Sequence, residues 1–300
     1  MSRETEKILS EFEKFISDKE LNSDEDCEEA VNEFMKNMLI GSLNESEKKG
    51  EDAWDYLDMA YESDNEEDAL TYAKKALKLD KNCLDAEVMV AELTTETKEE
   101  LKRKYEKLIV KAEKHLKEER IWADENIGIF WGIHETRPYM RLRHSFMHLL
   151  LEMGKYKKAI KECEDLLVLS EGDNLGVRYI LISLYAFFED EINAMKLYNK
   201  FNKEESAHML LPITALYYKL DNYKKAETFL KKLDEANDSL EEFFGNYGNV
   251  MDDPEVEEAF NLGMYRPGSK EELVLAVLDS AFLYTTNEGF LRWISNHYSS

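Results

Sequence analysis

An internal repeat constrains the fold of this 300-residue chain more than any other feature of its sequence. The segment Gly154-Lys-Tyr-Lys-Lys-Ala159 recurs with small changes as Asp221-Asn-Tyr-Lys-Lys-Ala226, and Glu189-Asp-Glu-Ile-Asn-Ala194 lies between the two copies. Alanines therefore recur at positions 159, 194 and 226, with spacings of 35 and 32 residues. A period of this size is typical of repeats in which each unit is a pair of antiparallel helices.

Small and large residues keep the same register around these alanines. A small residue near the start of the second helix lets the two backbones of a pair approach closely, and a large residue late in the first helix fills the remaining space. We therefore predict an all-α fold, a tetratricopeptide-type helical-repeat solenoid. The predicted small positions are Ala69, Ala159, Ala194 and Ala226, and the predicted large positions are Tyr61, Leu150, Tyr185 and Tyr217.

The predicted solenoid occupies most of the chain. We expect about five helix pairs over residues 50–236, with N-terminal capping helices over 1–45 and C-terminal capping helices over 240–300, because open solenoid ends need covering. No stretch rich in Pro, Gly or Ser divides the chain, so a single helical domain over 1–300 is expected. With only 12 Gly and 4 Pro, the sequence also lacks the turn residues of a β-rich protein.

Charge and composition exclude several classes of function. The 39 basic and 64 acidic residues give a net charge of −25, which repels phosphate backbones and argues against nucleic-acid binding. No apolar run is long enough for a membrane span, and the charged N-terminal residues are unlike a signal peptide. The cysteines, Cys27, Cys83 and Cys163, are odd in number and far apart, which suits a reducing compartment. We predict a cytoplasmic protein, monomeric or weakly dimeric, that binds neither nucleic acid nor membrane.

One stretch carries a family resemblance. The segment Phe130-Trp-Gly-Ile-His-Glu-Thr-Arg-Pro-Tyr-Met-Arg-Leu-Arg143 resembles the signature of bacterial tetratricopeptide repeat proteins that are similar to part of the suppressor of tumorigenicity 7 protein. Segments Trp54–Leu93, Asp173–Ile180 and Tyr284–Trp293 are similar to the same family, so the resemblance spans residues 50 to 297. It implies a helical-repeat fold and brings no assigned activity with it.

The candidate site is a cluster of arginine, histidine and tryptophan at residues 131–148 in an otherwise acidic chain. Pro138 is expected to open a helix, on which Arg141, His144 and His148 share one face. Repeat geometry directs this face toward the concave groove of a solenoid, to which the following repeats add further residues. The groove candidates are Arg137, Arg141, His144, His148, Tyr179, Ser183, His208 and Tyr218.

Two functions and one structural alternative follow from this cluster. We predict a non-enzymatic scaffold that binds a protein segment, of a partner still to be identified, in the concave groove through charge-assisted bidentate contacts. As an alternative, the cluster at 131–148 would bind a small anionic ligand. The structural alternative is that Arg143 and Arg178, which stand at packing positions between helices, pair with acids such as Glu135 or Asp173 inside the protein.

The sequence gives little support to enzymatic or metal chemistry. It contains no nucleophile elbow, no phosphate-binding loop and no dinucleotide fingerprint. His144 and His148 have the spacing of two metal ligands on a helix, but no third ligand accompanies them. Cys163 lies on an apolar helix face and is expected to be an inert thiol. We therefore predict no enzyme, no cofactor and no metal site.

Overall fold

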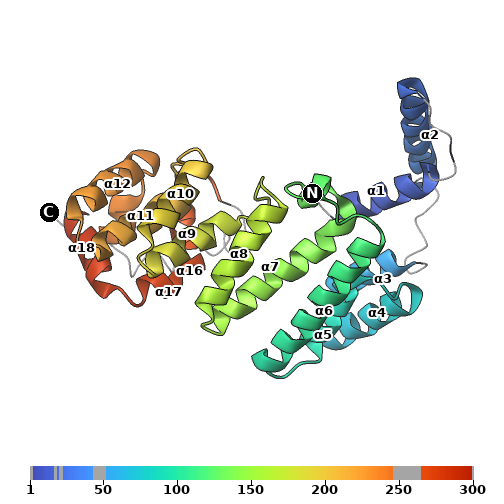
Figure 1. Ribbon diagram of the computed structural model, residues 1–300, viewed down its shortest axis with the longest axis horizontal. Coiled ribbons are helices and arrows are strands. Elements are labelled where there is room, and N and C mark those ends of the chain that lie inside the picture. The colour runs from blue at the N-terminus through green and yellow to red at the C-terminus, as the bar shows by residue number, and fades with distance from the viewer. Residues whose placement is uncertain (1–2, 17–18, 20–22, 43–51, 246–264, 299–300) are drawn as a thin grey trace. The chain divides into compact units, whose positions relative to one another are not determined.

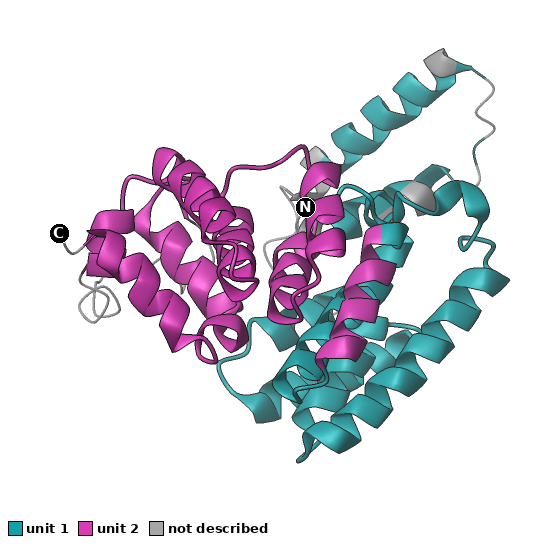
Figure 2. Cartoon of the chain, turned by 60° about the vertical axis from the view of Figure 1, so that its left-hand side comes forward, with its two compact units in different colours: residues 1–155, 168–172 teal, residues 156–167, 173–300 magenta. Residues whose placement is uncertain are grey.

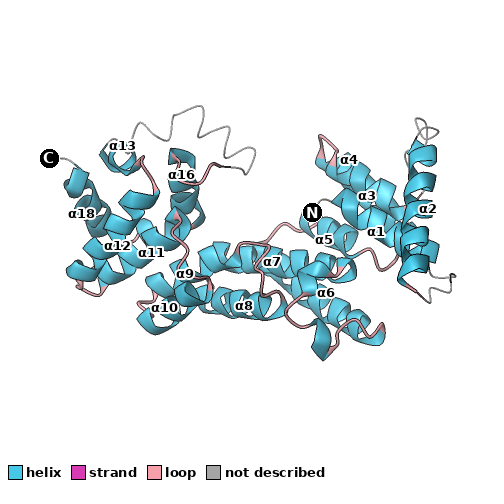
Figure 3. Cartoon of the chain, turned by 90° about the horizontal axis from the view of Figure 1, so that it is seen from above, coloured by secondary structure: helices cyan, strands magenta, loops and turns pink. Residues whose placement is uncertain are grey.

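The computed structural model describes residues 3–16, 19, 23–42, 52–245 and 265–298 of the chain. Over these ranges the regular elements are all helices, and no strand is present, so the predicted all-α class is confirmed (Figures 1 and 3). The α-helices are α1 (Arg3–Ile16), α2 (Asp24–Ser42), α3 (Ala53–Tyr61), α4 (Glu66–Leu79), α5 (Leu84–Leu93), α6 (Lys98–Glu118), α7 (Arg137–Glu152), α8 (Tyr156–Leu169), α9 (Val177–Phe187), α10 (Glu191–Lys200), α11 (Ala207–Lys219), α12 (Tyr223–Ala236), α13 (Leu240–Gly245), α16 (Lys270–Asp279), α17 (Ala281–Tyr284) and α18 (Glu288–Tyr298). Three short 3-10 turns, η1 (Asp124–Asn126), η2 (Phe130–Gly132) and η3 (His134–Thr136), precede α7.

Polar residues fix where the helices begin. The side chain of Asp52 accepts the backbone N–H of Asp55, and the Asp55 side chain accepts that of Asp52, which makes a capping box at the start of α3. At the starts of α4 and α6, the side chains of Asn65 and Thr97 each accept one backbone N–H, from Asp68 and Glu100 respectively. Pro138 stands in the first turn of α7, as predicted, because a proline there removes no intrahelical hydrogen bond.

The repeated segments share one turn geometry. Gly154, Glu189 and Asp221, which are the first residues of the three aligned segments, all have left-handed backbones, with φ of 66°, 60° and 55°. In each turn the next residue donates its N–H to the carbonyl of the large residue five positions earlier, which closes the helix end. These bonds join Lys155 to Leu150, Asp190 to Tyr185 and Asn222 to Tyr217, with N···O distances of 2.8, 2.9 and 2.9 Å.

Burial follows the predicted register except at Tyr61. The small residues Ala159, Ala194 and Ala226 are fully buried, and the large residues Leu150, Tyr185 and Tyr217 are buried too, whereas Tyr61 is 44% exposed. The turn after Tyr61 has no left-handed residue, so the register differs there and Leu57, one helical turn earlier, fills the interior instead. The expectation for Tyr61 was therefore wrong.

The chain divides into two compact units (Figure 2). Unit 1 comprises residues 1–155 and 168–172, and unit 2 comprises residues 156–167 and 173–300, so the division crosses α8. Because repeats contact mainly their neighbours, a division of this kind can also fall within a continuous helical array. The single domain over 1–300 stays a prediction.

Unit 1 is organised around a core rich in alanine. Ala69, Ala73 and Ala76 of α4 pack against α3, and Ala86 and Met89 of α5 continue the same core. Small side chains at this interface allow the helices to pack closely without voids. Helices α6 and α7 pack against α5, and α1 approaches η3. The helices expected over residues 1–45 correspond to α1 and α2.

Unit 2 contains the helix pairs α9–α10 and α11–α12 and the helices expected over residues 240–300. Helix α17 packs against α9, and α16 and α18 pack against α11. Glu272 of α16 is buried and accepts the backbone N–H of Ala207 at 2.9 Å and that of Gly268 at 2.7 Å, which ties α16 to the start of α11. The C-terminal helices thus lie across α9 and α11. Residues 246–264 of the expected cap lie outside the described residues.

Candidate functional site

Arg141 lies at the centre of an ion-pair cluster in unit 1. Its Nη1 and Nη2 donate to the two carboxylate oxygens of Glu6 in α1, at 2.7 and 3.0 Å. Its Nε and Nη2 donate to the two oxygens of Asp85 in α5, at 3.0 and 2.6 Å. Glu6 is only 1% exposed. The fork of this predicted groove residue therefore grips two carboxylates of the chain itself.

Arg137 completes the cluster one turn earlier on α7. Its side chain is 1% exposed, its Nε donates to the carbonyl of Trp131 at 2.8 Å, and its Nη1 lies 3.6 Å from Glu6 Oε1. Burial lowers the pKa of Arg141, but hydrogen bonds to Asp85 and Glu6 and their charges outweigh it, so the pKa is raised overall. Two guanidinium groups thus balance two buried carboxylates.

His144 and His148 contact each other on the next turns of α7. Their Nε2 atoms are 3.3 Å apart and their ring centroids 4.5 Å apart. Burial first, and the nearby charge of His148 second, lower the pKa of His144 to about 4. His144 is therefore neutral at pH 7 and adds no positive charge to the cluster. Within the described ranges, no group of three or more His, Cys, Asp or Glu side chains has a metal-binding arrangement.

Arg143 and Arg178 occupy helix-packing positions. Arg143 is buried, and its Nη1 donates to the Tyr139 hydroxyl at 2.7 Å. Arg178, in unit 2, donates from Nη1 to Asp173 at 2.8 Å and from Nε to Glu204 at 2.9 Å. Arg178 therefore pairs inside the protein with Asp173, one of the two acids named as partners in the structural alternative. Glu135 lies elsewhere: Oε2 of this residue is 3.2 Å from Nδ1 of His134.

Ser183 and Tyr218 of unit 2 face the C-terminal helices. Ser183 is fully buried and accepts the Ser280 hydroxyl at 2.7 Å. The Tyr218 ring packs against Phe290 and Trp293, with centroid distances of 5.6 and 5.5 Å. The expectation of an open groove at Ser183 is therefore corrected, because the α16–α17 junction covers it.

Tyr179 and His208 belong to a second covered cluster of unit 2. His208 is 5% exposed, and its ring lies 4.8 Å from that of Tyr179 and 5.2 Å from that of Tyr265. The Tyr179 hydroxyl donates to Glu204 at 2.7 Å, and His208 Nε2 lies 3.6 Å from Asp279. His208 thus also departs from the open groove that the repeat geometry predicts, since the C-terminal segment occupies this position.

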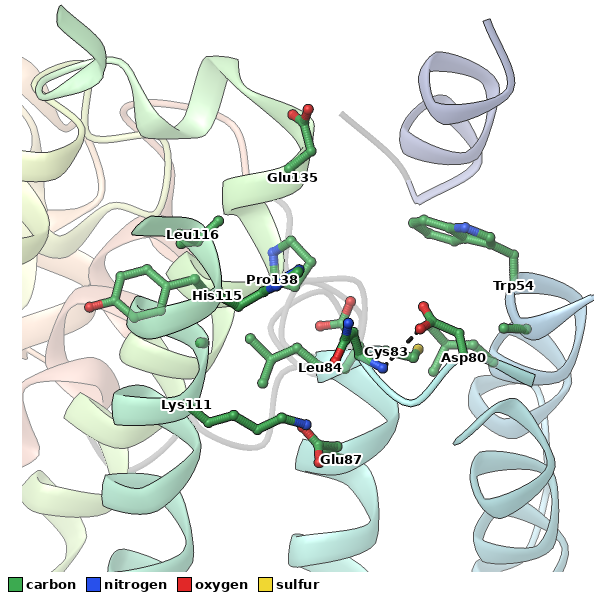
Figure 4. A pocket seen from close by; sticks show the side chains of 16 residues that line it. Trp54, Asp80, Cys83, Leu84, Glu87, Lys111, His115, Leu116, Glu135 and Pro138 are labelled. Atoms are coloured by element: carbon green, nitrogen blue, oxygen red, sulfur yellow. Dashed lines mark hydrogen bonds and ion pairs between the residues drawn. The ribbon is translucent and has the colours of Figure 1, made fainter. Parts of the chain in front are cut away.

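A pocket of about 160 Å³ opens in unit 1 beside the ion-pair cluster. Trp54 and Asp80 lie on one side of it, His115 and Pro138 on the other, and Leu84 between them (Figure 4). Helices α3, α5, α6 and α7 all contribute to its walls. Sequence reasoning missed this pocket because only tertiary packing brings these distant segments together. The sequence signal that could have indicated this pocket is Trp54, a large residue early in a repeat within an acidic chain.

The pocket walls combine apolar side chains with carboxylates. Burial raises the pKa of Cys83 to about 12, although a hydrogen bond from the backbone N–H of Ala86 lowers it in part. This thiol therefore stays protonated at neutral pH. Lys111 donates to Glu87 at 2.8 Å and is therefore already paired. The carboxylates that line the pocket are those of Asp80, Asp85, Glu87 and Glu135.

Comparison of the sequence with protein-family models and with curated proteins finds no match to either. In the part of the chain that the structure describes, no helix combines the length and the apolar character needed to cross a membrane. Fold and site define the class instead: an all-helical protein built from packed helix pairs, with a charge-balanced arginine cluster beside an acidic, partly apolar pocket.

Proposed function

We propose that this protein is a non-enzymatic scaffold of the tetratricopeptide type, and that it binds a segment of a partner protein in the pocket of unit 1. The recurrent left-handed turns at Gly154, Glu189 and Asp221 support the solenoid, because one backbone conformation returns at the repeat period. The observation that carries the binding function is the pocket beside Trp54. Helical-repeat proteins commonly bind extended segments of other proteins, and this part of the argument is an analogy of fold.

The size and lining of the pocket suit a side chain of a bound segment. A volume of about 160 Å³ lies below the range of roughly 300–1,000 Å³ that is typical of sites for whole small molecules. Trp54, Leu84 and Pro138 provide apolar and aromatic surface on three helices. Tryptophan and tyrosine are enriched among the residues that dominate binding energy at protein interfaces.

The alternative, a small anionic ligand at residues 131–148, receives less support from the geometry. The Nε, Nη1 and Nη2 atoms of Arg141 already donate to Glu6 and Asp85. An incoming anion would have to displace two carboxylates that are held by the fold. We therefore place the binding function in the pocket and not at the arginine fork.

Selection from a library of peptides tests this function. The full chain is immobilised, phage-displayed random peptides are selected, and each selected peptide is then measured against Ala53→Phe. Ala53 is the first residue of α3 and lines the pocket, so a phenyl ring there fills it. Ala281→Phe, at the first residue of α17 in unit 2, is the matched control.

The selected peptides are expected to bind the wild type and Ala281→Phe equally and Ala53→Phe at least about tenfold more weakly, since the ring takes the volume of the bound side chain. Circular dichroism of both variants is the check that they keep their helix content. Failure to enrich any peptide, or equal binding by Ala53→Phe, would remove the proposed function.

A further inference from the structure

We propose that the pocket of unit 1 recognises a basic side chain, an arginine or a lysine flanked by apolar residues, in the bound segment. This inference rests on the proposed function and names the chemistry of the partner. It follows from which charges in the pocket are already neutralised and which are not.

Two of the four pocket carboxylates have cationic partners within the chain. Asp85 is held by the Arg141 fork, and Glu87 accepts from Lys111. Asp80 differs, because the partner of its carboxylate is an uncharged backbone group. Its Oδ1 accepts the N–H of Asn82 at 2.8 Å. Across the residues that the structure describes, Asp80 forms no ion pair with a lysine or arginine.

The position of Asp80 strengthens its negative potential. Asp80 is the C-cap of α4, whose last carbonyl groups carry the negative end of the helix dipole. Glu135 lies at the rim of the pocket (Figure 4). Its Oε2 lies 3.2 Å from Nδ1 of His134, a side chain that is charged only when it is protonated. The chain as a whole carries a net charge of −25, which further attracts cations to an open acidic site. A cation that enters here gains a partner that the protein does not supply.

The remaining walls match the body of a long basic side chain. The indole of Trp54 and the carboxylate of Asp80 lie on the same side of the pocket (Figure 4), so that a guanidinium or ammonium group at Asp80 can also approach the indole face. Leu84 and Leu116 line the pocket as well and can cover the methylene stem, which is apolar. Arginine offers the planar fork that fits a carboxylate and an aromatic ring together.

The direct test uses matched peptides and the indole N–H signal of Trp54. The probe is the peptide acetyl-Gly-Leu-Arg-Leu-Gly-amide, and its counterpart carries citrulline, a neutral isostere, in place of arginine. Each peptide is titrated into the ¹⁵N-labelled full chain, and the Trp54 signal is assigned with Trp54→Phe. Asp80→Asn removes the charge but keeps an oxygen that accepts the N–H of Asn82. Glu227→Gln, an exposed acid of α12 in unit 2, is the control for the change in net charge.

The arginine peptide is expected to shift the Trp54 signal, and its affinity should fall about tenfold or more with citrulline or with Asp80→Asn, the loss expected for a charge-assisted hydrogen bond. Glu227→Gln should leave the affinity unchanged. Equal binding of the citrulline peptide, an unchanged affinity in Asp80→Asn or no binding of the arginine peptide would each overturn the inference. The proposed function would still stand in those cases if library peptides without a basic residue bind the wild type and not Ala53→Phe.

Discussion

Arg141 in α7 and Glu6 in α1 are joined by two parallel N–H···O bonds of 2.7 and 3.0 Å, although 135 positions of sequence separate them. The same guanidinium holds Asp85 of α5, so one side chain connects three helices of unit 1. Arg141 was predicted to bind a segment of a partner protein. In the structure it binds α1 of its own chain instead. The contact makes the docking of α1 depend on charge as well as on apolar packing.

Removing the charge of Glu6 should destabilise unit 1. In Glu6→Gln, Arg141 keeps Asp85, but Arg137 loses the carboxylate at 3.6 Å while it remains buried. Breaking a buried ion pair from one side costs about 3–5 kcal/mol of unfolding free energy, because a charge is left without its partner. Urea denaturation followed by circular dichroism measures the change. Glu96→Gln, at an exposed position between α5 and α6, is the control, and an equal effect of both substitutions would contradict the prediction.

Arg141→Lys should also be destabilising, although it conserves the charge. An ammonium group is a single point charge and cannot place separate donors on both oxygens of Glu6 and of Asp85, as the Arg141 fork does. We expect a loss of about 1.5–3 kcal/mol, the worth of one charge-assisted hydrogen bond. Thermal unfolding compares this variant with Arg103→Lys, a conservative change on the exposed side of α6. A melting temperature equal to that of the wild type would show that the fork geometry contributes nothing.

The sequence was sufficient to predict the helical class and the repeat register. Small and large positions such as Ala194 and Tyr185 are set by local spacing, and both are buried. Pro138 opens α7 for an equally local reason. Tyr61 was assigned wrongly because the turn after it has no left-handed residue, and Tyr61 stands only eight residues before Ala69, whereas Tyr185 stands nine before Ala194. The tetratricopeptide type of the solenoid stays a prediction.

The surroundings of the candidate site could not be read in the same way. Which acid reaches Arg141 depends on long-range packing, and among 64 acidic residues nothing in the sequence distinguishes Glu6 or Asp85. The cover over Ser183 and His208 comes from segments about 57 to 97 positions away, which is again a tertiary property. Local spacing predicts which residues share a helix face, and it does not predict what that face contacts.

Glu272 should be essential for docking the C-terminal helices in unit 2. Its buried carboxylate accepts the backbone N–H groups of Ala207 and Gly268. Glu272→Ala leaves the buried N–H of Ala207 and the partly buried N–H of Gly268 without this partner. An unsatisfied buried group costs about 1–3 kcal/mol, and a partly buried one costs less. We expect urea denaturation to report a loss of about 2–4 kcal/mol. Glu271 is one position earlier in α16 and only partly buried, so Glu271→Ala should cost much less unfolding free energy. A similar loss in both variants would contradict the prediction, because it would mean that any substitution in this turn of α16 is destabilising and that the two hydrogen bonds are not the cause.

Protonation of His144 should destabilise the protein as the pH falls. Its pKa is lowered from the ordinary 6.5 to about 4 by burial and then by His148. Between these values the unfolded chain binds a proton that the folded chain does not, so the unfolding free energy rises with pH. The stabilisation is complete above pH 6.5 and is lost as the pH falls. The loss reaches about 3 kcal/mol of unfolding free energy by pH 4.

Carboxylates titrate in part of the same interval, so the measurement is a comparison of two proteins. Urea denaturation at a series of pH values between 7 and 4 is carried out on the wild type and on His144→Gln, which cannot gain the charge. The difference in unfolding free energy between the two should shrink steadily as the pH falls, because only the wild type loses the His144 contribution. Parallel pH profiles would mean that His144 titrates at its ordinary pKa in the folded protein, and that its contact with His148 at 3.3 Å does not depend on neutrality.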